Sequence, residues 1–147
     1  MRKRFENKVV IVTGSGSGIG ETTAIRFSEE GANVIIADIN TNTGNQVSNK
    51  ININSGKSYF IETDVSDLNS VKNMVEKTVK RFGPPDVLIN NAGINVFNEP
   101  LKMSIEEWKM AFSVDLDGVW FGCQSVLPYM VEKKKGAIVN LASVHAI

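Results

Sequence analysis

A glycine-rich segment offers the clearest chemistry in this sequence. Residues 13–20 read Thr-Gly-Ser-Gly-Ser-Gly-Ile-Gly, between an apolar run and a helical stretch. Glycines let a backbone turn tightly and approach a pyrophosphate, and the start of the next helix supplies N–H groups and positive dipole. The spacing is TGxxxGxG rather than GxGxxG, and no Gly-Lys-Ser/Thr follows, which excludes a Walker A loop. The segment predicts a dinucleotide-binding turn, the alternative being a loop without a ligand. The predicted cofactor contacts are Gly14, Ser15, Ser17, Gly18, Ile19 and Gly20.

Asp38 ends the second apolar run and is the next residue that could contact such a cofactor. A carboxylate at this place can accept hydrogen bonds from the adenosine ribose hydroxyls and would repel a 2′-phosphate. The nearby Ile39 and Ser17 are not basic, so neither offers a positive charge to clamp that phosphate. The pattern therefore favours NAD over NADP, against the alternative of an ordinary acid in the turn after a strand.

Five short apolar runs surround these residues and predict strands buried on both faces of a parallel sheet. They are Lys8–Thr13, Asn33–Asp38, Ser58–Glu62, Asp86–Asn90 and Ala137–Leu141. Helical stretches alternate with them, over Gly18–Glu30, Thr41–Asn54, Asp67–Phe82 and Ser104–Lys134, the last expected to hold a short helix and then a long one. This alternation predicts an α/β fold, a Rossmann-type doubly wound parallel sheet with strand order 3-2-1-4-5.

The helical stretches differ in strength. Asp67–Phe82 has one apolar face, with Ser66 as the predicted N-cap and Gly83 as its end. Thr41–Asn54 is rich in Asn and contains Gly44, so we expect a frayed or late-starting helix there. Tyr59, in the third strand, is predicted to be packed.

Four motifs at the ends of successive strands resemble those of the short-chain dehydrogenase/reductase family, and the resemblance extends from Lys8 onward. They are Thr13-Gly14-x-x-x-Gly18-Ile19-Gly20, Asp64-Val65, Asn90-Asn91-Ala92-Gly93 and Ile138-Val139-Asn140-Leu141-Ala142-Ser143. The resemblance implies an oxidoreductase that moves a hydride between nicotinamide and a small-molecule alcohol or carbonyl substrate.

The resemblance also implies a role for each motif. Asp64 would accept from the adenine amino group, with the Val65 backbone beside it. Asn91, Ala92 and Gly93 would let the chain pass close to the cofactor, while Asn90 would tie strands together. Ser143 would be catalytic and hold the substrate oxygen.

This chain departs from the family pattern at two places. Asp115 stands in Val114-Asp115-Leu116-Asp117-Gly118, where the family usually has an Asn that supports a proton relay. We keep Asp115 as a second catalytic candidate, because a carboxylate can accept but not donate as an amide does; the alternative is a helix-stabilising or solvated acid. The family's Tyr-x-x-x-Lys pair, which follows the serine, does not occur before Ile147.

Tyr129 and Lys133 have the Tyr-x-x-x-Lys spacing but precede the serine, and we expect them at the wrong end of the sheet, as an ordinary helical pair. We expect residues 1–147 to form a single NAD-binding domain, cut short after a fifth strand that forms an exposed edge. These residues alone are predicted to be inactive. The alternative functions are a non-catalytic nucleotide-binding module and an assembly protein from a truncated gene.

Composition restricts the partners. Sixteen Lys and Arg balance sixteen Asp and Glu, which argues against nucleic acid or a membrane surface, and no apolar run is long enough to span a bilayer. The lone Cys123 suits a reducing, cytoplasmic setting. We predict no metal site, and interpret His145 as a loop residue. The stretch 104–134 is apolar on more than one face, which predicts a homodimer or homotetramer assembled through it.

Overall fold

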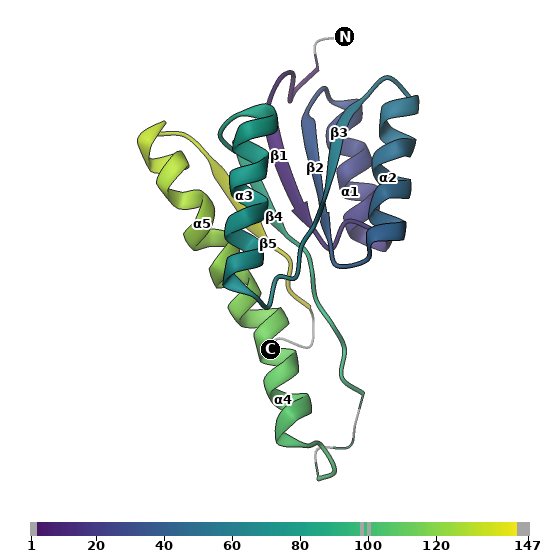
Figure 1. Ribbon diagram of the computed structural model, residues 1–147, viewed down its shortest axis with the longest axis vertical. Coiled ribbons are helices and arrows are strands. Elements are labelled where there is room, and N and C mark those ends of the chain that lie inside the picture. The colour runs from purple at the N-terminus through teal and green to yellow at the C-terminus, as the bar shows by residue number, and fades with distance from the viewer. Residues whose placement is uncertain (1–2, 98, 100, 144–147) are drawn as a thin grey trace.

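The computed structural model describes residues 3–97, 99 and 101–143. Its centre is a parallel sheet of five strands in the order β3-β2-β1-β4-β5 (Figure 1). This confirms the predicted α/β fold class and strand order. The strands are β1 (Val9–Thr13), β2 (Asn33–Asp38), β3 (Lys57–Glu62), β4 (Val87–Asn90) and β5 (Ala137–Asn140).

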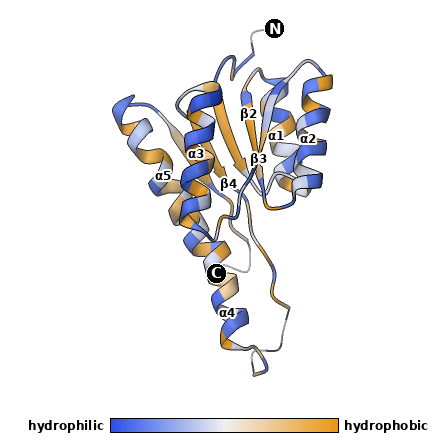
Figure 2. Ribbon diagram, viewed as in Figure 1, coloured by the Kyte–Doolittle hydropathy of each residue, from blue (hydrophilic) through white to orange (hydrophobic). Residues whose placement is uncertain are grey.

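Helices cover both faces of this sheet. Helices α1 (Gly18–Glu29) and α2 (Thr41–Ile53) lie on one face, and α3 (Leu68–Phe82) and α5 (Gly118–Glu132) lie on the other. Successive strand residues point to opposite faces, so Val10 and Val12 join the core under α1 and α2, whereas Ile11 packs toward α3 and α5. Burial on both sides explains why β1, β2 and β4 are apolar along most of their length (Figure 2). The prediction of burial on both faces was wrong for the edge strands β3 and β5, in which half or more of the residues are exposed.

Helix α3 begins at a different cap from the one predicted. Asp67, not Ser66, is the N-cap, and its carboxylate accepts the Asn69 N–H at 2.9 Å. Ser66 instead donates its hydroxyl to Asp64. Asp and Ser are both good N-caps, so their order in the sequence could not decide between them. Gly83 ends the helix as predicted, with a φ of 95° that favours glycine.

Helix α2 is better formed than its composition predicted, and the expectation of a frayed or late start was wrong. It begins at Thr41, because the Asn40 side chain accepts the N–H groups of Asn42 and Thr43, each at 3.1 Å. Gly44 is buried against the Phe60 ring of β3. Capping and packing on the sheet therefore outweigh the poor helix propensity of Asn and Gly.

The stretch from Ser104 onward forms one helical column. Helix α4 (Ile105–Phe112) passes through a π-helical turn, η1 (Ser113–Asp117), into α5. Ser104 and Glu107 form a reciprocal capping box at its start. Figure 1 shows α4 extending beyond the carboxyl ends of the strands, whereas α5 packs on the sheet. The short helix and the long one of the prediction are thus joined without a loop.

The two edge strands are more exposed than the centre of the sheet. Val139 of β5 is 48% exposed, as expected for an edge. Tyr59 of β3 is 43% exposed, so the prediction that it is packed was wrong. The centre of its ring lies 5.2 Å from the Arg81 guanidinium of α3. This contact is possible because one side of an edge strand has no neighbouring strand, so exposed helix residues can reach it.

Candidate functional site

A cavity of about 570 Å³ lies at the carboxyl ends of the strands. The loops after β1 to β4 form most of its wall, and the helical column closes one side. Every predicted cofactor-contact residue except Ser15 lines it: Gly14, Ser17, Gly18, Ile19, Gly20, Asp38, Asp64, Val65, Asn91, Ala92 and Gly93. The four motifs, far apart in the sequence, thus meet at one place, as ligand sites of open α/β sheets do.

The glycine loop passes too close to its neighbours for side chains. Gly14 has a φ of 62°, and a Cβ there would lie 2.7 Å from the Ala92 Cα. A Cβ on Gly20 would lie 2.5 Å from the Asn91 Nδ2 and would collide with the Gly14 carbonyl. These glycines keep the loop flat against the segment after β4. The cradle that results has room beside the backbone for a group such as a pyrophosphate.

Thr13 and Asn91 fasten this cradle. The Thr13 hydroxyl oxygen accepts the N–H groups of Asn91 and Ala92, at 3.0 and 3.1 Å. The Asn91 amide donates to the carbonyls of Thr13 and Gly14, at 2.9 and 3.1 Å. Asn90 points the other way and donates to Asn140 at 2.9 Å, which ties β4 to β5 as predicted.

The two serines of the glycine loop have different surroundings. Ser15 is wholly buried: its hydroxyl donates to the Val12 carbonyl at 2.7 Å and accepts the Ala37 N–H at 3.1 Å. Ser15 therefore lies inside the fold rather than on the cavity wall, and holds the loop to β2. Ser17 is the exposed N-cap of α1, so the first turn of that helix, with its unpaired N–H groups, faces the cavity.

Asp38 presents a fixed carboxylate to the same cavity. Its Oδ2 accepts the Gly16 N–H at 2.8 Å, and its Oδ1 accepts the Asn40 N–H at 2.9 Å. The residue is half-buried, and the adjacent Ile39 is 65% exposed. No Lys or Arg belongs to the described wall of this cavity, so Asp38 supplies negative charge that no wall cation balances.

The Asp64–Val65 pair forms the next part of the wall. Asp64 Oδ1 accepts from the Ser66 N–H at 2.9 Å and from its hydroxyl at 2.6 Å. Val65 is nearly buried, and a Cβ on Gly118 of α5 would lie 3.0 Å from it. The pair is therefore held rigidly where it meets the helical column.

The two catalytic candidates do not lie on the wall that the structure describes. Asp115, in the π-helical turn, accepts the Ile94 N–H at 2.9 Å and so holds the segment that follows Gly93. Ser143 is exposed and lies three residues beyond the end of β5, at the same edge of the sheet. Both roles stay predictions. His145 lies outside the described residues.

Sequence reasoning missed part of the wall. The additional residues are Ile39, Thr63, Ser66, Ile94, Met110, Ser113 and Val114. Most of them are immediate neighbours of the motifs, a signal that could have found them. Met110 and Ser113 belong to the helical column. They could be assigned to the wall only once the path of that column was known, and no sequence motif marks this path.

Tyr129 and Lys133 lie at the opposite end of the sheet, as predicted. The Lys133 N–H donates to the Tyr129 carbonyl at 3.1 Å, as in an ordinary helical i,i+4 pair. The Lys133 ammonium contacts Asp86 at 3.0 Å and the Pro84 carbonyl at 3.2 Å, before β4. Partial burial works to raise the pKa of Asp86, but the Val9 N–H and Lys133 hydrogen bonds hold it below its ordinary value. This cluster joins β1, β4 and α5 away from the cavity.

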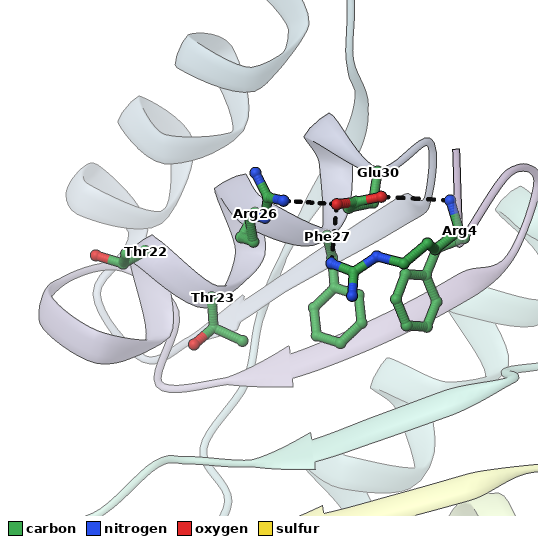
Figure 3. Close-up of a pocket in the computed structure, with 7 residues that line it drawn as sticks. Arg4, Thr22, Thr23, Arg26, Phe27 and Glu30 are labelled. Carbon is green, nitrogen blue, oxygen red and sulfur yellow. Dashed lines mark hydrogen bonds and ion pairs between the residues drawn. The ribbon is translucent and has the colours of Figure 1, made fainter. Parts of the chain in front are cut away.

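A second hollow, of about 350 Å³, lies between α1 and the N-terminal segment (Figure 3). Glu30 accepts there from both Arg4 and Arg26, at 2.8 and 2.6 Å. Phe5 and Phe27 meet edge to face beside it, with ring centres 4.7 Å apart. Because its charges already pair with one another, this hollow is a structural clasp for the N-terminal segment.

The described ranges contain neither a metal-binding cluster nor a membrane-spanning helix. No group of three or more His, Cys, Asp or Glu side chains is placed to hold a metal ion in that part of the chain. None of its helices is both long enough and apolar enough to cross a membrane.

Comparison with known proteins agrees with this geometry. A family model described as short chain dehydrogenase matches residues 8–147. Meso-2,3-butanediol dehydrogenase of Serratia marcescens is 42% identical over 144 residues, which cover 98% of this chain and 56% of that protein. The 3-oxoacyl-[acyl-carrier-protein] reductase of Thermotoga maritima is 39% identical, with 98% and 58% covered. Tropinone reductase-like 2 of Erythroxylum coca is 40% identical, with 97% and 52% covered. The chain spans little more than half the length of these relatives.

Proposed function

Because this chain belongs to the short-chain dehydrogenase family, we propose that it is the cofactor-binding part of an NAD-dependent oxidoreductase. The observation that carries the proposal is the cavity, where a glycine cradle, a helix start and the Asp38 carboxylate converge. Its substrate is a small alcohol or carbonyl compound. Two relatives are named for a diol and for an oxo group, which supports this substrate class.

The residues of the cavity divide the work of holding a dinucleotide. The flat loop at Gly14 and Gly20 and the first turn of α1 receive the pyrophosphate. Asp38 accepts from the adenosine ribose hydroxyls. Asp64 and Val65 contact the adenine, and the Asn91–Gly93 segment lies along the nicotinamide end. When bound, the nicotinamide supplies the hydride chemistry.

NAD is preferred over NADP on electrostatic grounds. Asp38 holds its carboxylate at the ribose position, and the described wall carries no basic side chain to offset it. A 2′-phosphate placed there meets like charge, whereas a ribose diol donates two hydrogen bonds.

Ser143 steadies the substrate oxygen in this proposal, and Asp115 holds the backbone after Gly93 in place. The 147 residues contain no Tyr-x-x-x-Lys after Ser143. General acid–base catalysis contributes roughly 10²–10⁴-fold, so we expect these residues alone to bind cofactor without appreciable turnover.

Titration of the chain with NADH and NADPH, followed by nicotinamide fluorescence, tests the proposal. We expect saturable binding of NADH, at least about 10-fold tighter than NADPH, since one charge-assisted hydrogen bond is worth at least that much. Asp38→Ala should bring the two affinities together. Lys72→Ala on the outer surface is the control and should change neither. Equal or tighter binding of NADPH by the unmodified chain would contradict the proposed preference.

A further inference from the structure

Gly16 lies one layer behind the cavity wall, between Asp38 and Thr43. It is buried, and it is not among the residues that line the described cavity. Its N–H donates to Asp38 Oδ2 at 2.8 Å, while the Asn40 N–H donates to Oδ1 at 2.9 Å. Each carboxylate oxygen therefore has one backbone donor, and together the two donors fix the plane of the carboxylate.

Space, rather than backbone conformation, requires a glycine at this position. The φ of Gly16 is outside the left-handed range in which Gly14 and Gly18 lie. A Cβ on Gly16 would nevertheless lie 2.6 Å from Thr43 Oγ1 and 2.9 Å from both Cγ and Oδ2 of Asp38. A methyl group added here must displace the carboxylate, the Thr43 hydroxyl or both.

We propose that Gly16 is a positioning residue that sets the cofactor selectivity of this chain by fixing the Asp38 carboxylate. A carboxylate has about four lone-pair sites, so two remain for the hydroxyl groups of a ribose diol. A diol matches them only if the carboxylate keeps its plane, and the same fixed charge opposes a 2′-phosphate. This inference rests on the proposed NAD-binding function and adds a residue that touches neither cofactor nor substrate.

A double-mutant cycle tests it, with the ratio of the NADP⁺ to the NAD⁺ dissociation constant as the readout. Calorimetry is run on the unmodified chain, Gly16→Ala, Asp38→Ala and the double variant. Gly16→Ala should weaken the binding of NAD⁺ by about 3–10-fold and that of NADP⁺ by less. This is the size expected when the charge-assisted contact between Asp38 and the ribose hydroxyls is strained. In the Asp38→Ala background, Gly16→Ala should not lower the ratio further. Thr43→Ala alone, which leaves the carboxylate in place, is the matched control and should keep the ratio.

The alternatives give different results. A loop-folding role for Gly16 would weaken both nucleotides equally, and would do so with or without Asp38; that result overturns the inference. If Gly16→Ala does not fold, it is combined with Thr43→Ala, which removes the crowding against the Thr43 hydroxyl and leaves that against the Asp38 carboxylate. An unchanged ratio of the two dissociation constants in this double variant also overturns the inference. Failure of the unmodified chain to prefer NAD⁺ refutes the proposed function and the inference together. A preference for NAD⁺ that is the same size in Gly16→Ala as in the unmodified chain refutes only the inference.

Discussion

Thr13 illustrates how one side chain joins two segments of the site. Its hydroxyl accepts two N–H groups from the segment after β4, while the residue itself is 2% exposed. The motif predicts a threonine beside the glycines but not its two partners, because they come from Asn91 and Ala92, far along the chain. At the residue scale, sequence identifies the groups of this site and only the fold assigns their contacts.

Thr13→Val tests this contact at nearly constant shape. Valine would leave the N–H groups of Asn91 and Ala92 without an acceptor in a largely buried place. We expect a loss of about 1–3 kcal/mol in the free energy of unfolding, measured by urea denaturation. Thr22→Val is the matched control, because the Thr22 hydroxyl donates to the Gly18 carbonyl at an exposed position. A loss no larger than that of the control would contradict the assigned role.

The elements that could be predicted from sequence are those whose patterns reflect burial. The central strands β1, β2 and β4 could be recognised because both of their faces are covered, and α3 because one of its faces is buried. Helix α2 was underestimated, since its stability comes from the Asn40 cap and from contact with β3, neither of which a local propensity includes. Tyr59 was misjudged because an edge strand looks like a central one in sequence.

Gly44→Ala distinguishes propensity from packing in α2. Alanine favours a helix by about 1 kcal/mol over glycine, but its methyl group would collide with the Phe60 ring. We expect packing to win, with a net loss of about 1–3 kcal/mol in unfolding free energy. Asn49→Ala, at an exposed position of the same helix, should stabilise slightly. Stabilisation by Gly44→Ala in a denaturation experiment would show that α2 packs differently.

The N-terminal clasp gives α1 a pH-dependent contact. Hydrogen bonds from Arg4 lower the pKa of Glu30 from about 4.5 to about 2. A carboxyl group with a lowered pKa stabilises the fold above its unfolded-state pKa, and this contribution disappears as the pH falls through the folded value. The clasp should therefore weaken below about pH 4.5.

Arg4→Ala tests the clasp by removing its largest contact. When the pH is lowered from about 6 to about 3, the free energy of unfolding should fall less in the variant than in the unmodified chain. Thermal melts at each pH measure this difference. The difference should shrink in roughly 1 M salt, because Arg4 is 67% exposed. Identical pH profiles for the two proteins would show that the ion pair does not form in solution.

At the scale of the whole molecule, the helical column leaves an apolar stripe uncovered in the described chain. The stripe consists of Trp108, Phe112, Leu116 and Trp120, which are 52%, 43%, 57% and 60% exposed. The stripe runs along the column from α4 through η1 into α5. A partner that covers all of it needs an apolar surface that is equally long. We propose that a second copy of the chain covers it, giving a homodimer or a homotetramer.

Trp120→Glu should disrupt that assembly. A carboxylate within this apolar stripe would be buried in the interface without a partner, so light scattering should report the monomer mass. Lys109→Glu, an exposed residue on the same column, is the control and should leave the assembly intact. A monomeric unmodified chain at high concentration would contradict the proposed oligomer.

A crystal structure of the chain grown with NAD⁺ would show whether the cavity at the carboxyl ends of the strands holds this cofactor. We expect the pyrophosphate to lie against the first turn of α1, with the adenosine ribose hydroxyls within hydrogen-bond distance of Asp38. Density for the nucleotide elsewhere, as in the hollow between Arg4 and Phe27, would contradict it. So would an empty cavity at a saturating concentration of NAD⁺.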